Sequence, residues 1–234
     1  MSPPLLVFDL DGTLADSAPD LLATLDAVLP RHGFPLAADE SPRNGIGHGA
    51  RYLIEYALKT RQISVDTPTL DAIHRDFLLH YEANISVETR LFPGTEILLD
   101  RFATAGWAFA VCTNKPERMS RLLLRDLGVA NRFAAICGGD TFPRKKPDPA
   151  HLLNTIAAAL GMRETAVMVG DSRTDLDTAR AAGVPFVGVT FGYTPVPMAE
   201  LAPDLLVESY DALSPKDAER LFTEPAMALA AAMP

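Results

Sequence analysis

Short apolar runs alternate with helical patterns along most of this chain, and the alternation leaves few architectures open. Apolar runs without polar interruption are typical of strands buried on both faces, as in a parallel sheet covered by helices. We therefore expect an α/β protein with a doubly wound parallel sheet. The expected strands are residues 5–9, 108–113, 134–139, 166–171 and 185–190, with a sixth candidate at 204–209.

The segments between these runs have the apolar spacing and the length of amphipathic helices. Four helices are expected at residues 94–105, 116–127, 149–160 and 173–182, and a last one from Tyr210 to about Phe222.

Residues 17–88 interrupt the alternation. They contain helical patterns, for example at 17–33 and 70–85, but no run that resembles a buried strand. A helical domain inserted after the first strand is the simplest interpretation. The chain of 234 residues is long enough for this division, which predicts a core of residues 1–16 and 89–234 and a helical cap domain of residues 17–88.

Composition limits the partners and the location. The chain has 30 Asp and Glu residues against 21 Lys and Arg residues, a net charge of −9. Nucleic acid and anionic membranes both favour a basic face, so we expect neither as the main partner. The sequence has no signal-peptide pattern, and no apolar stretch approaches the ~20 residues that span a bilayer. Cys112 and Cys137 lie inside apolar runs without metal-ligand spacing, which favours reduced thiols in a cytoplasmic protein over a disulfide. A monomer or a homodimer is expected.

Polar residues stand at the ends of several predicted strands. In open parallel sheets, ligands bind beyond the carboxyl ends of the strands. Asp9, Thr113 and Asp171 all fall at such ends, so we expect them to converge on one site although they are far apart in the sequence.

Asp9 and Asp11 lie one residue apart in the stretch FDLDGTLADS. A tight turn at Asp11-Gly12 would explain Asp11 without any chemistry, but it does not explain Asp9 at the end of a strand. Two carboxylates this close repel each other unless a cation lies between them, and such hard oxygen ligands suit Mg²⁺. A carboxylate beside Mg²⁺ can attack a phosphoryl group and form an aspartyl-phosphate.

Three later segments offer partners for these carboxylates. Thr113 precedes a predicted helix whose N-terminus would suit a phosphate, although an ordinary helix cap also explains it. Lys146 is held extended by the proline that follows and could neutralise phosphate charge, or it is only a solvated lysine. Asp175 follows Asp171 by about one helical turn, so Asp171 could bind Mg²⁺ directly while Asp175 acts through water or holds Lys146. Asp177 is out of phase with that pair and is expected at the surface.

Taken in order, Asp9-x-Asp11, Thr113, Lys146 and Gly170-Asp171-x-x-x-Asp175 resemble the four motifs of the haloacid dehalogenase superfamily of phosphohydrolases. The helical insert resembles the cap domain of one branch of that superfamily. Within it, the stretches FDLDGTLADSAPDL, GGDTFPRKKPDP, VGDSRTDLDTARAAG and VGVTFGY are similar to those of the bacterial phosphoglycolate phosphatases.

The resemblance implies a Mg²⁺-dependent phosphatase that hydrolyses a small phosphomonoester, most of all 2-phosphoglycolate, through an aspartyl-phosphate. Asp9 would be the nucleophile, and Asp11 would be the general acid and base. The metal would be held by Asp9, the backbone carbonyl of Asp11 and Asp171, with Asp175 as a further member of the metal site.

The same resemblance implies that Thr113 and Lys146 stabilise the charge of the transferring group, with Asn114 beside them. The cap would exclude water and recognise the leaving group. The candidate for recognising the leaving group is a glycine-rich stretch of the cap, in which His48 or Arg51 would bind a substrate carboxylate. A turn with a surface arginine explains this stretch equally well.

Two alternatives stay open at this point. The same scaffold serves phosphatases of sugar phosphates and of pyrophosphate, and also a phosphosugar mutase. A receiver-type signalling domain also combines acidic residues, a threonine and a lysine around Mg²⁺, and a stable phospho-Asp9 without turnover would favour it. Such a domain would need neither the helical insert nor the pair Asp171 and Asp175.

Overall fold

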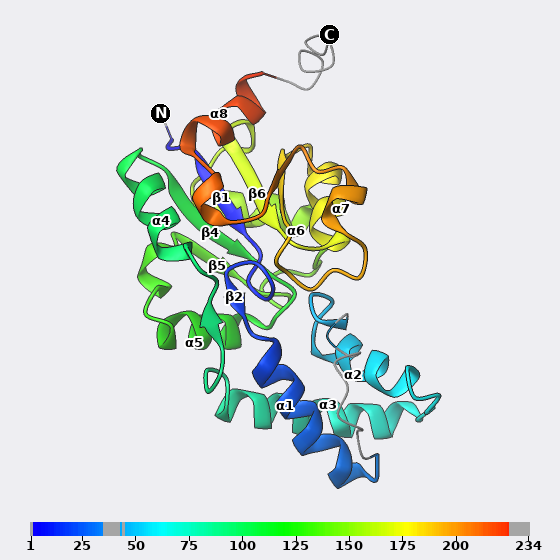
Figure 1. Cartoon of the computed structure of the whole chain (residues 1–234). Coiled ribbons are helices and arrows are strands. Elements are labelled where there is room, and N and C mark those ends of the chain that lie inside the picture. Colours follow the sequence, from blue (N-terminus) through cyan, green and yellow to red (C-terminus); the bar gives the residue numbers. More distant parts are fainter. Residues whose placement is uncertain (1, 35–42, 44, 225–234) are drawn as a thin grey trace.

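The computed structural model describes residues 2–34, 43 and 45–224. Its larger sheet has six parallel strands in the order β5-β4-β1-β6-β7-β8 (Figure 1). All six predicted strands are confirmed: β1 (Leu5–Phe8), β4 (Ala108–Cys112), β5 (Ala135–Cys137), β6 (Ala166–Gly170), β7 (Phe186–Val189) and β8 (Leu205–Val207).

The central strand β1 explains why these strands have uninterrupted apolar sequences. All four of its residues are fully buried. Leu6 and Phe8 belong to the apolar core on one face of the sheet, whereas Leu5 and Val7 belong to the core on the other face. A strand covered on both faces has no side that would tolerate polar residues, so the period-two pattern disappears.

Helices cover both faces of the sheet, as the doubly wound fold requires. The four predicted helices are confirmed as α4 (Thr95–Thr104), α5 (Glu117–Asp126), α6 (Pro149–Ala158) and α7 (Arg173–Ala182). Buried residues of α4, α5 and the C-terminal helix α8 (Pro215–Thr223) join the first core, and those of α6 and α7 join the second.

The last predicted helix is wrong at its start. The structure has a short 3₁₀ helix η6 (Tyr210–Ala212), and α8 begins only at Pro215. Leu213 between them is extended, and the Ser214 side chain caps α8 by accepting a hydrogen bond from the Asp217 amide at 3.2 Å. A serine followed by a proline in the first helical turn is a helix start rather than a helix interior. The other 3₁₀ helices described are η1 (Leu29–His32), η3 (Ala130–Arg132), η4 (Arg163–Thr165) and η5 (Met198–Leu201).

The segment between β1 and α4 is helical, as expected, and it is joined to the sheet by a small ribbon that was not predicted. Strands β2 (Ala15–Asp16) and β3 (Arg90–Leu91) pair antiparallel where the chain leaves and re-enters the core. Figure 1 shows the three helices of this segment grouped beyond one end of the sheet. They are α1 (Ala18–Val28), α2 (Ala50–Lys59) and α3 (Thr67–Ala83).

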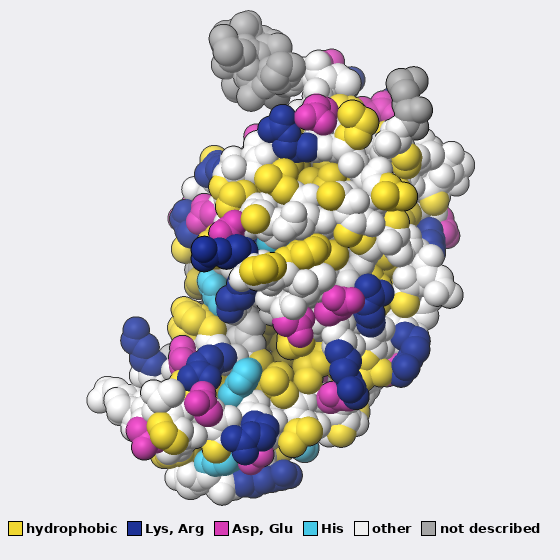
Figure 2. All heavy atoms as spheres, turned by 180° about the vertical axis from the view of Figure 1, so that it is seen from behind, with side chains coloured by type: hydrophobic (Ala, Val, Ile, Leu, Met, Phe, Trp, Pro, Cys, Tyr) yellow, Lys and Arg dark blue, Asp and Glu magenta, His cyan; other side chains and the backbone are white. Residues whose placement is uncertain are grey.

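The surface carries both signs of charge. Figure 2 shows acidic and basic side chains interspersed over the face opposite to that of Figure 1, without one continuous basic area. Within the described residues, no helix is both long enough and apolar enough to cross a bilayer. Cys112 and Cys137 are free and buried, and they are register partners on β4 and β5.

Candidate active site

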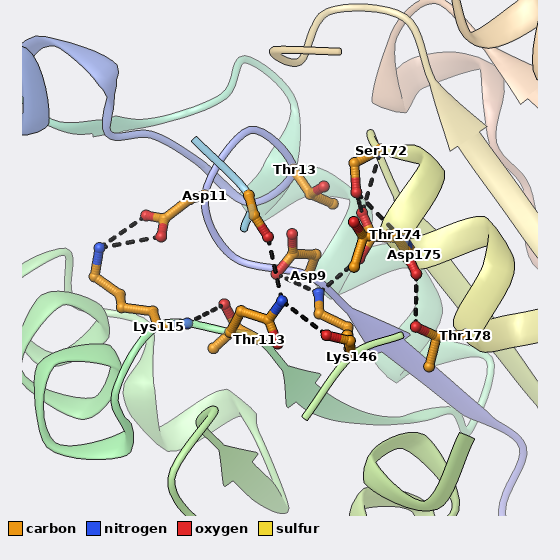
Figure 3. A network of polar contacts seen from close by, with 12 residues as sticks. Asp9, Asp11, Thr13, Thr113, Lys115, Lys146, Ser172, Thr174, Asp175 and Thr178 are labelled. Carbon is orange, nitrogen blue, oxygen red and sulfur yellow. Dashed lines mark hydrogen bonds and ion pairs between the residues drawn. The ribbon is translucent and has the colours of Figure 1, made fainter. Parts of the chain in front are cut away.

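Three neighbouring strands place polar residues close together at the carboxyl end of the sheet. Asp9 follows β1, Thr113 follows β4 and Asp171 follows β6, and β1 lies between the other two strands. Backbone hydrogen bonds continue the sheet into these residues, from the Asp9 amide to the Val169 carbonyl at 2.9 Å and from the Thr113 amide to the Cys137 carbonyl at 3.0 Å. The predicted convergence is therefore present: Figure 3 shows Asp9 and Thr113 close together, and a carboxylate oxygen of Asp171 lies within 4.8 Å of one of Asp9.

Lys146 lies at the centre of this group. Its Nζ is 2.9 Å from Asp9 Oδ1 and 2.6 Å from Asp175 Oδ1, and the side chain is completely buried. Burial by itself lowers the pKa of Lys146, but the carboxylates of Asp175 and Asp9 more than offset it and hold the pKa well above its usual value. Lys146 is thus a permanent cation beside Asp9. Of the two roles expected for Asp175, the structure contains the contact with Lys146.

The start of α7 fixes Asp175. Ser172 and Asp175 form a reciprocal capping box, in which Asp175 Oδ2 accepts hydrogen bonds from the Ser172 hydroxyl at 2.6 Å and from its amide at 3.1 Å. With Oδ1 on Lys146, both oxygens of the carboxylate are engaged. Gly170 makes room for it, because a Cβ there would lie 2.5 Å from the Asp175 Cβ. Asp177 is exposed, as predicted.

Asp171 is held by two hydrogen bonds and is surrounded by glycine backbone. Its Oδ1 accepts from the Thr13 hydroxyl and its Oδ2 from the Tyr193 amide, both at 2.9 Å. A Cβ at Gly12 would lie 2.5 Å from Asp171 Oδ2, and one at Gly192 would lie 2.2 Å from the Asp171 Cβ. Only glycine can stand at these two positions, so the turn after β1 and the loop after β7 close directly onto this carboxylate.

The donor set fits a hard divalent cation. One carboxylate oxygen from each of Asp9, Asp171 and Asp175 lies within 4.8 Å of the others, and all three side chains are buried. Burial raises the pKa of Asp9 to about 7, with Lys146 partly offsetting this and Asp175 adding to it. Burial, followed by repulsion from Asp175 and Asp9, raises the pKa of Asp171 to about 8. Three carboxylates against one ammonium leave an excess of negative charge that suits Mg²⁺.

Asp11 faces away from this cluster and toward a lysine that sequence reasoning missed. Lys115 Nζ lies 2.9 Å from Asp11 Oδ1 and 3.1 Å from Oδ2, and it donates a hydrogen bond to the Tyr81 hydroxyl at 2.7 Å. The Ser17 hydroxyl also donates to Asp11 Oδ1, at 2.6 Å. Lys115 is only 5% exposed. The one sequence feature that pointed to Lys115 is its position two residues after Thr113, which itself stands at the end of β4.

Thr113 and Asn114 hold the loop after β4 in place. The Thr113 hydroxyl accepts a hydrogen bond from the Lys115 amide at 3.2 Å. The Asn114 amide group donates to the backbone carbonyls of Lys146 at 3.2 Å and Gly47 at 3.4 Å. Asn114 therefore connects the carboxyl end of β4 to the loop that contains Lys146 and to the helical segment.

His48 and Arg51, the two residues predicted to bind the leaving group, have different surroundings. His48 is exposed beside the site, and its Nδ1 lies 3.2 Å from the Thr174 hydroxyl at the start of α7. Arg51 lies on the exposed side of α2, with its guanidinium 2.5 Å from Asp71 and 3.5 Å from Glu55. The structure brings His48 to the edge of the site but does not bring Arg51 to it.

A cavity lies between the carboxylates and the helical segment. The lining from the sheet side is polar, and most of the lining from the helical segment is apolar. The polar lining consists of Asp9, Asp11, Thr113, Asn114 and Lys115, and the helical segment contributes Leu21, Ile46, Leu53, Phe77, Leu78 and Tyr81, among others.

Comparison with known proteins agrees with this geometry. Residues 6–189 match the family model described as haloacid dehalogenase-like hydrolase. A phosphoglycolate phosphatase of Mesorhizobium japonicum is 46% identical over 221 residues, which cover 94% of this chain and 97% of that protein. One from Agrobacterium fabrum is 42% identical over 225 residues, covering 96% and 97%. A crystal structure of a predicted phosphoglycolate phosphatase from Haemophilus somnus has a TM-score of 0.82 at 30% identity, covering 90% of this chain and 96% of that one.

Proposed function

The chain belongs to the haloacid dehalogenase-like hydrolases, and on that premise we propose that it is a Mg²⁺-dependent phosphatase that hydrolyses 2-phosphoglycolate. The observation that carries the proposal is the contact of Asp9 with Lys146 beside Asp171, at the ends of adjacent strands. A nucleophile, a cation for the phosphoryl charge and a divalent-metal site are the parts that phosphoryl transfer to an aspartate needs.

In the first step a carboxylate oxygen of Asp9 attacks phosphorus. The bond from phosphorus to the ester oxygen breaks, and the phosphoryl group is transferred to Asp9. Lys146, held by Asp175 at 2.6 Å, balances the charge of the phosphoryl oxygens, and the Thr113 hydroxyl offers a hydrogen bond to one of them. These groups are buried, so their electrostatic effect is stronger than it would be in water.

Asp11 moves the proton. It gives a proton to the leaving oxygen as the ester bond breaks, so that the product departs as an alcohol. It then takes a proton from the water that attacks phosphorus, which releases inorganic phosphate and restores the Asp9 carboxylate. Ser17 and Lys115 hold the Asp11 side chain at 2.6 Å and 2.9 Å for both steps.

Asp9, Asp171 and the backbone carbonyl of Asp11 would hold Mg²⁺, with Asp175 beside them. The bound ion would neutralise the phosphoryl oxygens and allow a dianion to approach a cluster of carboxylates.

We assign residues 17–88 the role of a cap over the cavity. Ile46, Phe77 and Tyr81 of this segment line the same cavity as Asp9 and Asp11, which supports a role in excluding water and in recognising the leaving group. His48 stays a candidate for binding the leaving group. The contact of Arg51 with Asp71 favours a structural role for that residue.

Phosphate release tests the proposal. The purified protein with Mg²⁺ is assayed on 2-phosphoglycolate, on sugar phosphates and on pyrophosphate, with chelator added in a parallel series. We expect the highest kcat/KM on 2-phosphoglycolate and reversible loss of activity with chelator. Release from none of these substrates would refute the phosphatase, and higher kcat/KM on a sugar phosphate or on pyrophosphate would refute the assigned substrate.

A further inference from the structure

The cavity has one cationic group among the described residues that line it. No arginine or histidine is among them, and the only lysine is Lys115. Lys146 lies at the phosphoryl-transfer end of the site, where it contacts Asp9 and Asp175. Figure 3 shows the two ammonium groups directed at different carboxylates, Lys146 at Asp9 and Lys115 at Asp11. A substrate with two anionic ends would therefore meet one cation at each end.

Lys115 lines the cavity, and its ammonium carries three N–H groups. Two of its three hydrogen bonds go to the two oxygens of a single carboxylate, Asp11, at 2.9 Å and 3.1 Å, and the third goes to the Tyr81 hydroxyl at 2.7 Å. Burial raises the pKa of Tyr81 well above its usual value, so the hydroxyl stays neutral and does not compete with an anion for the ammonium. A ligand carboxylate in the cavity would replace the longer of the two contacts with Asp11, which would keep its bond through Oδ1.

The position of Lys115 suits the leaving group rather than the phosphoryl group. Asp11, the proposed proton donor to the leaving oxygen, lies 2.9 Å from Lys115 Nζ. A group attached one carbon away from that oxygen would lie near the ammonium. The rest of the wall is largely apolar, with Leu21, Phe77 and Met119, so little else there would compensate a negative charge.

We propose that Lys115 is the specificity-determining residue of this site and binds the carboxylate of an acidic leaving group. The inference rests on the proposed phosphatase function and names the substrate class, phosphomonoesters of short hydroxy acids. A charge-assisted hydrogen bond in a buried cavity is strong, and a site built around it discriminates against neutral analogues.

The test compares two esters of equal length, 2-phosphoglycolate and 2-hydroxyethyl phosphate, which differ in a carboxylate against a hydroxymethyl group. Lys115→Gln is measured on both. We expect its kcat/KM on 2-phosphoglycolate to fall at least about tenfold further than its kcat/KM on 2-hydroxyethyl phosphate, mainly through KM. Lys216→Gln, an exposed lysine on α8, is the matched control and should change neither value. An equal loss on both esters would overturn the inference, because Lys115 would then only position Asp11.

Two further measurements keep the inference testable. Lys115→Arg retains the charge and should keep most of the preference for the acidic ester even if Lys115→Gln is poorly folded. Calorimetric binding of 2-phosphoglycolate to Asp9→Asn, with and without Lys115→Gln, reports the subsite without turnover, and equal affinities would contradict it. If the wild-type protein hydrolyses neither ester, the proposed function fails. If it hydrolyses both without a preference that depends on Lys115, only the inference fails.

Discussion

At the scale of single residues, the charge balance around Asp9 determines the behaviour of the site. Asp9 is 1% exposed, contacts Lys146 at 2.9 Å and shares its surroundings with Asp171 and Asp175. Its carboxylate is the proposed nucleophile, and burial destabilises its negative charge when no metal is bound.

Replacing Asp9 by Asn should therefore separate chemistry from folding. We expect Asp9→Asn to lower kcat by more than about a thousandfold, because an amide is a poor nucleophile. The free energy of unfolding of the metal-free protein should not fall, since the variant removes a repelled buried charge. Phosphate release and chemical denaturation measure the two effects. Asp177→Asn, on the exposed side of α7, is the control, and retained turnover in Asp9→Asn would remove Asp9 as nucleophile.

The raised pKa values predict how stability depends on pH without metal. An unfolded aspartate loses its proton near pH 4, whereas folded Asp9 and Asp171 keep theirs to about pH 7 and about pH 8. Between these limits the folded state binds more protons, so these two residues lower the free energy of unfolding as pH rises. Buried His151 raises the free energy of unfolding as pH rises, because burial lowers its pKa to about 4 in the folded state. Above about pH 6.5 the unfolded histidine is neutral as well, so His151 adds no further pH dependence there.

Thermal unfolding in chelator should thus show the melting temperature falling from about pH 6.5 to about pH 8. Mg²⁺ should raise the melting temperature most at the upper end, where no proton has to be displaced from the carboxylates. The same scan on Asp9→Asn should show a shallower fall. A melting temperature that rises through this window in chelator would contradict this charge balance around Asp9.

The sequence predicted the partners of Asp9 but not those of Asp11. Asp171 and Asp175 were predictable because one stands at a strand end and the other one helical turn beyond it, and a parallel sheet brings such ends together. Lys146 lies in the loop between β5 and α6, and only the resemblance to the family's motifs related it to the site. Lys115 was missed because its burial depends on Tyr81, a residue of α3 that no local pattern connects to it. The closer carboxylate partner of Arg51, Asp71, also comes from another helix, where sequence spacing gives no signal.

At the scale of elements, the start of α7 links helix stability to the site. Ser172 caps the helix and donates to Asp175 Oδ2 at 2.6 Å, while Asp175 Oδ1 holds Lys146. Ser172→Ala should lower the free energy of unfolding by about 1 kcal/mol, as other lost caps do, and should also lower kcat several-fold as Lys146 loses its fixed position. Denaturant unfolding and steady-state kinetics measure the two effects.

The matched control is the cap of α8. Ser214 accepts from the Asp217 amide as Ser172 does from the Asp175 amide, but it lies in the C-terminal segment away from the lysine. Ser214→Ala should cost similar stability and leave kcat unchanged. Equal kcat losses in both variants would mean that the cap of α7 has no special connection to the chemistry.

Elements were predictable where burial on both faces left an uninterrupted apolar run or where a helix was long enough to show its period. The ribbon of β2 and β3 was not, because each strand has only two residues and its pairing joins Ala15 to Leu91 across the whole helical segment. The break before α8 was signalled by Ser214 and Pro215, but the apolar pattern continues across it.

At the scale of the whole molecule, the joint between the sheet and the helical segment determines how the cavity is closed. Tyr193, in the loop after β7, reaches this joint, where its hydroxyl donates to Asp16 Oδ1 at 2.6 Å and accepts from the Ala18 amide at 3.1 Å. Its own amide donates to Asp171 Oδ2 at 2.9 Å. One residue thus connects the Asp171 carboxylate to the point where the chain enters α1.

Tyr193→Phe removes the two hydroxyl contacts and keeps the ring and the amide. We expect the free energy of unfolding to fall by about 1–2 kcal/mol, because the buried Ala18 amide loses its acceptor. Amide exchange at the start of α1 should quicken, and kcat/KM should fall more than metal affinity, since the backbone bond to Asp171 remains. Tyr52→Phe, at an exposed tyrosine on α2, is the control. Unchanged exchange at Ala18 would show that the ribbon of β2 and β3 alone holds the joint, and a fall in metal affinity alone would place the effect of Tyr193 at Asp171 instead.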